Sequence, residues 1–274
     1  MAIFVSLVLA ALEWRVVKGN VGAVWNGWGA VEGTLRRRNR APMRYRVLVP
    51  WMLALLGKVG LGTGLWQYEV LKVGLLAGAL WVAEALLGTV GMLALAVLVA
   101  STFEWDYWDC YGELLGVGLI LLAGERGTWW LAVAGGLVWG LSRETALLAP
   151  VLGLLAGGWW CGAAALVGPW AMGLARLYQG KAGLYCERWT LYVYNLRDLA
   201  LAGKRKDVGP WLSVLWTVAT VFVCVGVWEC GGVMDRTRWV MLAWLGAGWL
   251  MGRSRETRVF LPCALWMAGV IGEL

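Results

Sequence analysis

The sequence predicts an all-α fold, a polytopic transmembrane helix bundle of about ten spans, with a range of about 8 to 11. Hydrophobic residues make up 61% of the 274 positions and charged residues 15%. Soluble domains carry about a quarter charged residues. No long polar segment separates a soluble part, so we expect one integral membrane domain, residues 1–274, in the cell membrane.

The apolar runs of the chain give the expected helices. Several are shorter than the ~20 residues that cross a hydrocarbon core of ~30 Å, so we expect tilted or partly buried helices. The runs are 1–12, 47–66, 70–103, 111–124, 128–142, 146–159, 161–175, 211–228, 239–251 and 259–271. The first run has no basic residues before it and no small-residue cleavage site after it, which favours a retained helix over a signal peptide.

The run 70–103 is long enough for one tilted span or for two short spans that break near Gly88. One span is favoured because alternating spans then gather 19 of the 24 Lys and Arg residues on one face. Lys58 and Lys72 fall on the other face, with three arginines. The polar-face segments are 13–46, 104–110, 143–145, 176–210 and 252–258.

A six-residue motif, Gly-x-Ser-Arg-Glu-Thr, occurs at 140–145 and again at 252–257, and a proline follows each copy after four residues. Each copy lies where one helix is expected to end and the next to begin. We expect Ser142 to cap the new helix and Glu144 to lie in its first turn. The motif is either a capped turn with an Arg–Glu pair at the interface or a recurrent element of a site.

Three carboxylates precede and enter the run 111–124. Asp106, Asp109 and Glu113 are spaced to form one stripe on a helix. A carboxylate within a span is costly and is a functional candidate by default. The stripe could act as a base, hold a divalent cation or pair with Arg143; the alternative is a helix start with a structural salt bridge. An unpaired charge here would be expensive, so we predict that Arg143 pairs with the stripe.

Basic residues cluster before the second run and between the seventh and eighth. Arg36–Arg40 is best interpreted as a solvated loop or a contact to anionic lipid. Arg44 and Arg46 adjoin a helix start and suit phosphate binding. The Tyr-, Arg- and Lys-rich segment 176–210 is an interfacial loop or an amphipathic helix covering a lipid-linked substrate.

The residue types and motifs that the chain lacks limit its cofactors. The chain has no His and none of its six Cys forms a Cys-x-x-Cys pair, so haem held by His, zinc and His-based catalysis are not expected. No metal site is assigned, and a divalent cation is the one cofactor left open. The expected partners are membrane lipid and protein partners within the membrane, and no nucleic acid.

Together these elements resemble bacterial multi-pass proteins of the GT-C glycosyltransferase superfamily, which use sugars carried on polyprenyl phosphates. The resemblance lies in Tyr45–Pro50, the Asp106/Asp109/Glu113 helix start, Arg143-Glu144-Thr145 before Pro150, and Arg255–Pro262. The chain would be a short or degenerate member.

The resemblance implies a transferase whose acidic catalytic residue follows the first helix, a place that Glu13 occupies. Asp106 and Asp109 are the other catalytic candidates. Binding of the polyprenyl-phosphate sugar donor would involve Arg44, Arg46, Glu113, Arg143, Glu144, Arg255 and Glu256.

Two further interpretations of function stay open. One is a non-catalytic, lipid-binding membrane scaffold or an accessory subunit of a larger complex. The other, an ion-coupled transporter using Glu84 and Glu113, is less favoured because no matching pair of broken helices occurs in the two halves. The basic residues place the polar face in the cytoplasm, whereas the resemblance places it outside.

Overall fold

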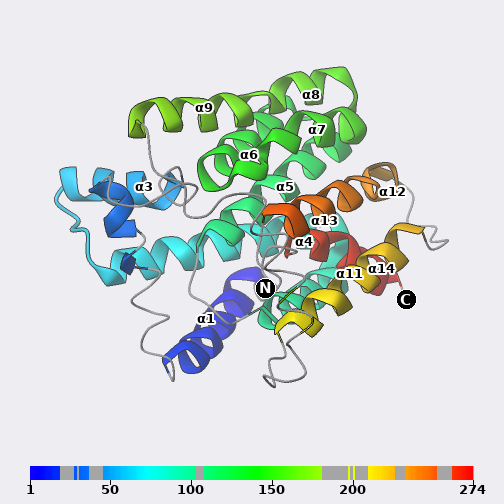
Figure 1. The fold of residues 1–274 in the computed structure, drawn as a ribbon, viewed down its shortest axis with the longest axis horizontal. Helices are drawn as coiled ribbons and strands as arrows, with labels where there is room; N and C mark the ends of the chain where they lie inside the picture. Colours follow the sequence, from blue (N-terminus) through cyan, green and yellow to red (C-terminus); the bar gives the residue numbers. More distant parts are fainter. Residues whose placement is uncertain are drawn as a thin grey trace.

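The computed structural model describes residues 1–18, 28–29, 31–36, 46–102, 108–180, 197, 200, 209–225, 232–251 and 261–273. Every element in these ranges is helical, which confirms the all-α prediction for the described part of the chain (Figure 1). The elements are α1 (Ala2–Lys18), α3 (Leu48–Lys58), α4 (Leu65–Ala100), α5 (Asp109–Arg126), α6 (Trp129–Ser142), the 3-10 helix η2 (Glu144–Leu148), α7 (Ala149–Gly157), α8 (Trp159–Ala165), α9 (Val167–Gln179), α11 (Gly209–Val225), α12 (Gly232–Thr237), α13 (Val240–Met251) and α14 (Ala264–Glu273).

Most helices follow the apolar runs closely, as α5 and α6 do. The run 47–66 gives only the short helix α3, because Gly60 and Gly62 have φ angles of 81° and 82° and turn the chain. The run 161–175 forms two helices, α8 and α9, which meet at Leu166. Among the described helices, one, α4, is therefore long enough to cross a membrane by itself, and several apolar runs form shorter helices.

Helices α5 and α6 form an antiparallel pair with direct backbone contact. A Cβ atom on Gly116 would lie 2.6 Å from Cβ of Trp139 and 2.8 Å from the Gly135 carbonyl oxygen. Helices α7 and α8 meet in the same way, because a Cβ on Gly153 would lie 2.7 Å from the Cys161 carbonyl oxygen. Such small-residue contacts are typical of helices that pack within a membrane.

Helix α4 is not straight. Gly88 has φ 71° and ψ −177°, so the helical backbone breaks at this residue. The first part of α4 runs parallel to α5: the Cβ position of Gly78 meets Leu115, and the Cβ position of Gly118 meets Val82. The break lies where the alternative of two short spans put it, while α4 as a whole is long and apolar enough for the favoured single span.

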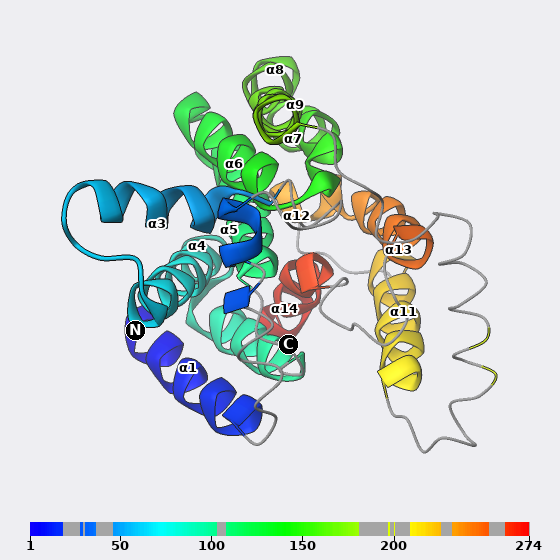
Figure 2. The same cartoon turned by 60° about the vertical axis from the view of Figure 1, so that its left-hand side comes forward.

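The second part of α4 packs against α14, where a Cβ on Gly272 would lie 3.2 Å from the Gly91 backbone. Figure 2 shows this bend, with α1 beside α4 and α14 close to the second part of α4. Since α4 and α5 run parallel, their starts lie at the same end of the bundle. Lys72 therefore lies near the start of α5, and its assignment to the opposite face is wrong.

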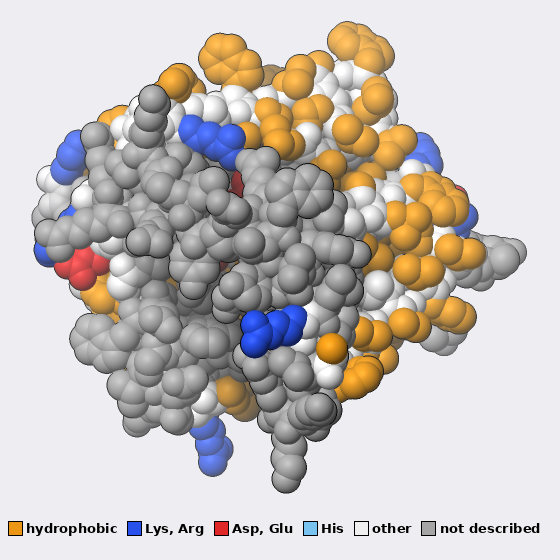
Figure 3. Space-filling view, in the orientation of Figure 1, with side chains coloured by type: hydrophobic (Ala, Val, Ile, Leu, Met, Phe, Trp, Pro, Cys, Tyr) orange, Lys and Arg blue, Asp and Glu red, His pale blue; other side chains and the backbone are white. Residues whose placement is uncertain are grey.

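The surface of the described residues is strongly apolar. Phe4 on α1 is 71% exposed, Trp81 on α4 54% and Phe222 on α11 76%. In Figure 3, hydrophobic side chains gather over the upper and right-hand parts of the molecule. Among the described residues, one helix, α4, is long and apolar enough to cross a membrane, and other apolar helices are 10 to 17 residues long.

Candidate functional site

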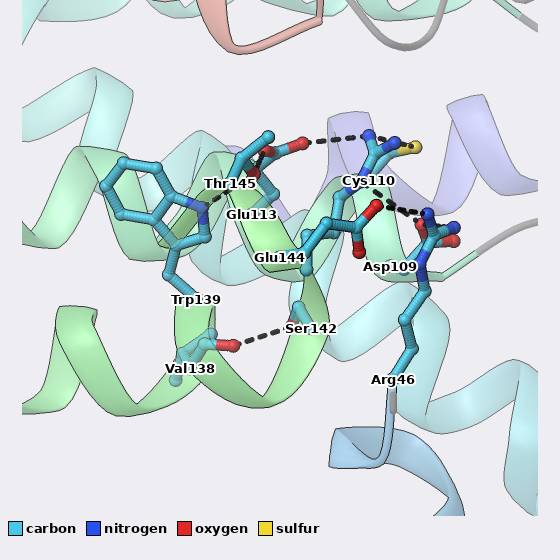
Figure 4. Close-up of polar contacts among 10 residues, drawn as sticks. Arg46, Asp109, Cys110, Glu113, Val138, Trp139, Ser142, Glu144 and Thr145 are labelled. Atoms are coloured by element: carbon cyan, nitrogen blue, oxygen red, sulfur yellow. Dashed lines mark hydrogen bonds and ion pairs between the residues drawn. The ribbon is translucent and has the colours of Figure 1, made fainter. Parts of the chain in front are cut away.

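Three chain segments meet at one end of the bundle: the start of α3, the start of α5, and the connection between α6 and η2. The backbone N–H of Val47 donates to the Leu141 carbonyl oxygen at 2.8 Å and ties α3 to the end of α6. Gly112 lets α5 approach the same point, since a Cβ there would lie 3.0 Å from Cβ of Ser142. These contacts bring the side chains of Arg46, Asp109 and Glu144 together (Figure 4).

Arg46 joins two carboxylates that are far apart in the sequence. Its Nη1 lies 2.7 Å from Oδ2 of Asp109, and its Nη2 lies 3.0 Å from Oε1 of Glu144. The Arg46 and Asp109 side chains are buried, and that of Glu144 is 21% exposed. One planar guanidinium group therefore fixes the start of α3 against both α5 and η2.

Arg143 contacts Asp109 as well, and in addition the carboxylate of Glu113. Its Nη1 lies 2.9 Å from Oε2 of Glu113, and its Nε lies 3.5 Å from Oδ2 of Asp109. The prediction that Arg143 pairs with the carboxylate stripe is confirmed. The Thr145 hydroxyl donates a short hydrogen bond to Glu113 and accepts one of 3.1 Å from Nε1 of Trp139. We name Arg46, Asp109, Glu113, Arg143 and Glu144 the arginine–carboxylate network.

The arginine–carboxylate network holds two cations and three carboxylates, which gives a net charge of −1 for its five members. Two of them, Arg46 and Glu144, lie in connections between the long helices. Burial alone would raise the pKa of Glu144. The charges of Arg46 and Arg143 outweigh this effect and lower the pKa to about 2. Burial lowers the pKa of Arg46, and the Glu144 and Asp109 carboxylates outweigh this and raise it. The charged forms therefore hold one another in place.

Glu13 lies within α1, which continues to Lys18, so the expectation that it follows the first helix is wrong. It belongs to a different cluster, beside the start of α5. Its carboxylate accepts a hydrogen bond of 3.2 Å from the Tyr111 hydroxyl and lies 3.3 Å from Nζ of Lys72. Lys72 also pairs with Glu69 at 2.9 Å and lies over the ring of Tyr68. Glu13 and Lys72 are both buried. The structure thus places Glu13 beside the start of α5, where it pairs with Lys72.

The partners of Glu13 were missed by sequence reasoning. A signal for them exists, because Lys72 is an ionisable residue inside an apolar run and Glu69 and Tyr68 precede it by one helical turn. The turn in α4 that brings Lys72 to Glu13 has no comparable signal beyond Gly88 itself.

The expected cap of the second helix is also corrected. Ser142 does not cap η2 or α7; its hydroxyl donates to the Val138 carbonyl oxygen at 2.6 Å, within α6. Glu144 does lie in the first turn of η2, as expected, but its carboxylate is directed to Arg46. The motif at 140–145 therefore joins helices through its charged side chains rather than through a capping hydroxyl.

Four candidate residues, Arg44, Asp106, Arg255 and Glu256, lie outside the described residues. The chain just after the second motif copy is described, and there Cys263 is buried. Among the described residues, no group of three or more His, Cys, Asp or Glu side chains could hold a metal ion. The carboxylates of the arginine–carboxylate network are instead directed to guanidinium groups.

Comparison with known proteins gives no relative for the chain: no protein-family model, no curated protein and no solved structure matches it. The functional argument therefore rests on the site itself. Its firmest element is the convergence of Arg46, Asp109 and Arg143 from three separate segments.

Proposed function

We propose that the chain is a multi-pass protein of the cell membrane, with about ten spans, some of them short or broken. The exposed aromatic and aliphatic side chains on α1, α4 and α11 support this, since they suit contact with lipid tails. The backbone contacts of α5 with α6 and of α7 with α8 support it as well. Within the described ranges, the buried charged residues lie in clusters near the start of α5, as expected where ionisable groups are costly.

We further propose that this protein is a GT-C-like glycosyltransferase that acts on a sugar carried by polyprenyl phosphate. The observation that carries the proposal is the convergence of three segments that the resemblance singles out, at Arg46, Asp109–Glu113 and Arg143–Thr145. Nothing in the local sequence forces these segments together. A shared site is a direct reason for arginines and carboxylates to meet inside an apolar bundle.

Arg46 and Arg143 would bind the donor phosphate. Guanidinium groups bind phosphate oxygens through paired hydrogen bonds, and binding would exchange carboxylate contacts for phosphate contacts. In the reaction, a base takes the proton of the acceptor hydroxyl and the acceptor oxygen forms a bond to the sugar carbon. The bond from that carbon to the phosphate oxygen breaks, and the arginines stabilise the negative charge on the leaving polyprenyl phosphate.

Asp109 is better suited to positioning the arginines than to taking this proton. Its Oδ2 atom contacts both Arg46 and Arg143, at 2.7 Å and 3.5 Å. The base would then be Glu13 or Asp106. Glu13 lies at the start of α5 with a hydroxyl, Tyr111, and a cation, Lys72, in contact with its carboxylate.

Sugar transfer by the purified protein in lipid vesicles tests this proposal, with a polyprenyl-phosphate sugar as donor. Glu13→Gln removes a base and should lower the transfer rate by about 10²- to 10⁴-fold while the protein stays folded and inserted. Glu32→Gln is the matched control, because Glu32 forms an exposed pair with Arg36. Full activity of Glu13→Gln would remove Glu13 from the reaction, and absence of transfer by the unmodified protein with all polyprenyl-phosphate sugars would contradict the transferase proposal.

A second candidate function is a non-catalytic membrane scaffold or accessory subunit. It is favoured by the internal pairing of both arginines, because Arg46 and Arg143 are buried and already neutralised by carboxylates. In that case the arginine–carboxylate network only joins α3, α5 and η2. The same transfer assay separates the two functions: a scaffold shows no transfer, and its network variants change unfolding alone.

A further inference from the structure

A cavity of about 660 Å³ lies at the other end of α5, away from the arginine–carboxylate network. The end of α5, the turn between α7 and α8, and α12 line it. Helices α5 and α7 are in direct contact beside it, since a Cβ on Gly124 would lie 2.6 Å from the Ala156 carbonyl carbon. The polar side chains that line the cavity are Glu125, Arg126 and Arg236, and Trp160 is the aromatic one.

The charges around this cavity differ from those of the network. Within the described part of the chain, the side chains of Glu125 and Arg126 are exposed and make no hydrogen bond or ion pair. Arg236 donates one hydrogen bond, of 3.0 Å, to the Ala156 carbonyl oxygen at the end of α7. Two cations and one carboxylate thus face a space that is open to a ligand.

The helix ends add a further electrostatic feature. Helices α5 and α7 both end at the cavity, and the C-terminal end of a helix carries a partial negative charge from its unpaired carbonyl groups. With Glu125, these carbonyl groups favour a cation, whereas Arg126 and Arg236 favour an anion. The cavity is therefore complementary to a group that carries both charges, more than to a simple anion.

Tryptophans mark the level of this end in a membrane. Trp129, Trp130 and Trp159 begin α6 and α8 next to the cavity and are 65%, 57% and 78% exposed. Tryptophan is enriched where the hydrocarbon core meets the headgroups. In the membrane placement proposed above, these exposed rings would lie with the cavity at the level of the lipid headgroups.

We propose that this cavity binds the headgroup of phosphatidylethanolamine. Its phosphate would contact Arg126 and Arg236, and its primary ammonium group would donate to Glu125 and to the terminal carbonyl oxygens of α5. Phosphatidylglycerol has the phosphate without the ammonium group and lacks half of these contacts. This inference rests on the membrane placement proposed above, and it is independent of the transferase activity.

Native mass spectrometry of the full-length protein tests the proposal, after mild removal of lipid and titration with phosphatidylethanolamine or phosphatidylglycerol. The unmodified protein should bind phosphatidylethanolamine about tenfold more tightly. Glu125→Gln should remove this preference, and Arg126→Gln should weaken binding of both lipids. Arg238→Gln is the matched control, because Arg238 pairs with Asp235 and packs on Trp239 outside the cavity.

Equal binding of the two lipids by the unmodified protein would overturn the proposal, and so would equal losses in the Arg126 and Arg238 variants. Fractionation of the cells that express the protein tests the membrane placement separately. It therefore shows whether a negative result concerns the headgroup site or the membrane placement. A protein recovered in the membrane without lipid preference overturns the headgroup site alone. A protein absent from the membrane fraction overturns both.

Discussion

The two ends of α5 carry the same kinds of side chain in opposite situations. At its start, Asp109 and Glu113 are buried and each contacts an arginine from another element. At its end, Glu125 and Arg126 are exposed and have no partner within the described residues. A buried charge needs a partner, so the first end fixes the positions of three segments. An exposed charge costs little without one, so the second end can keep its charges for a ligand.

Loss of an arginine should separate the two ends most clearly. Arg143→Met leaves Glu113 buried without its cation, which costs about 3–5 kcal/mol. Arg126→Met removes an exposed, unpaired cation and should change the free energy of unfolding by less than about 0.5 kcal/mol. Thermal unfolding of both variants in the same detergent measures the difference. Equal midpoints would show that the arginine–carboxylate network does not hold the fold together.

Backbone packing, in contrast, should be equally sensitive at both ends. A Cβ on Gly112 meets Ser142, and one on Gly124 meets the backbone of Ala156 at 2.6 Å. Gly112→Ala and Gly124→Ala should each destabilise the fold by about 1–3 kcal/mol. Gly74→Ala is the control, since nothing lies within 4 Å of that Cβ position in α4. If only Gly112→Ala reduced the unfolding midpoint, packing as well as charge would distinguish the two ends.

The sequence predicts the parts of this comparison that depend on local cost. The ends of α5 and α6 follow from an apolar run bounded by charged residues. The contact between Arg143 and the stripe follows because both lie at helix boundaries, where an unpaired charge is expensive. The sequence does not predict that Glu125 and Arg126 line a cavity. A solvated charged residue has the same sequence pattern whether or not it does so.

The contacts that the sequence did not predict depend on how the helices are oriented relative to one another. The break at Gly88 turns α4, so that the start of α5 returns to the end of the bundle where Lys72 of α4 pairs with Glu13 of α1. The apolar composition of the run 70–103 is compatible with one span or two. The sequence therefore does not predict which end of the bundle Lys72 lies at, or that it pairs with Glu13. The Ser142 hydroxyl likewise donates to the Val138 carbonyl group of its own helix instead of capping the next helix. The two local hydrogen bonds have similar energies, so the sequence does not decide between them.

Acid should weaken the start of α5 through Glu144. The pKa of Glu144 is about 2 in the folded protein, below the ordinary value of 4.5. Its stabilising contribution is therefore complete above pH 4.5 and is lost as the pH falls towards 2. In Glu144→Gln this contribution is absent at every pH. The unfolding midpoint of the unmodified protein should thus fall more steeply over this range than that of the variant. Parallel curves would mean that Glu144 does not help to hold Arg46, and that η2 is joined to α3 by packing rather than by charge.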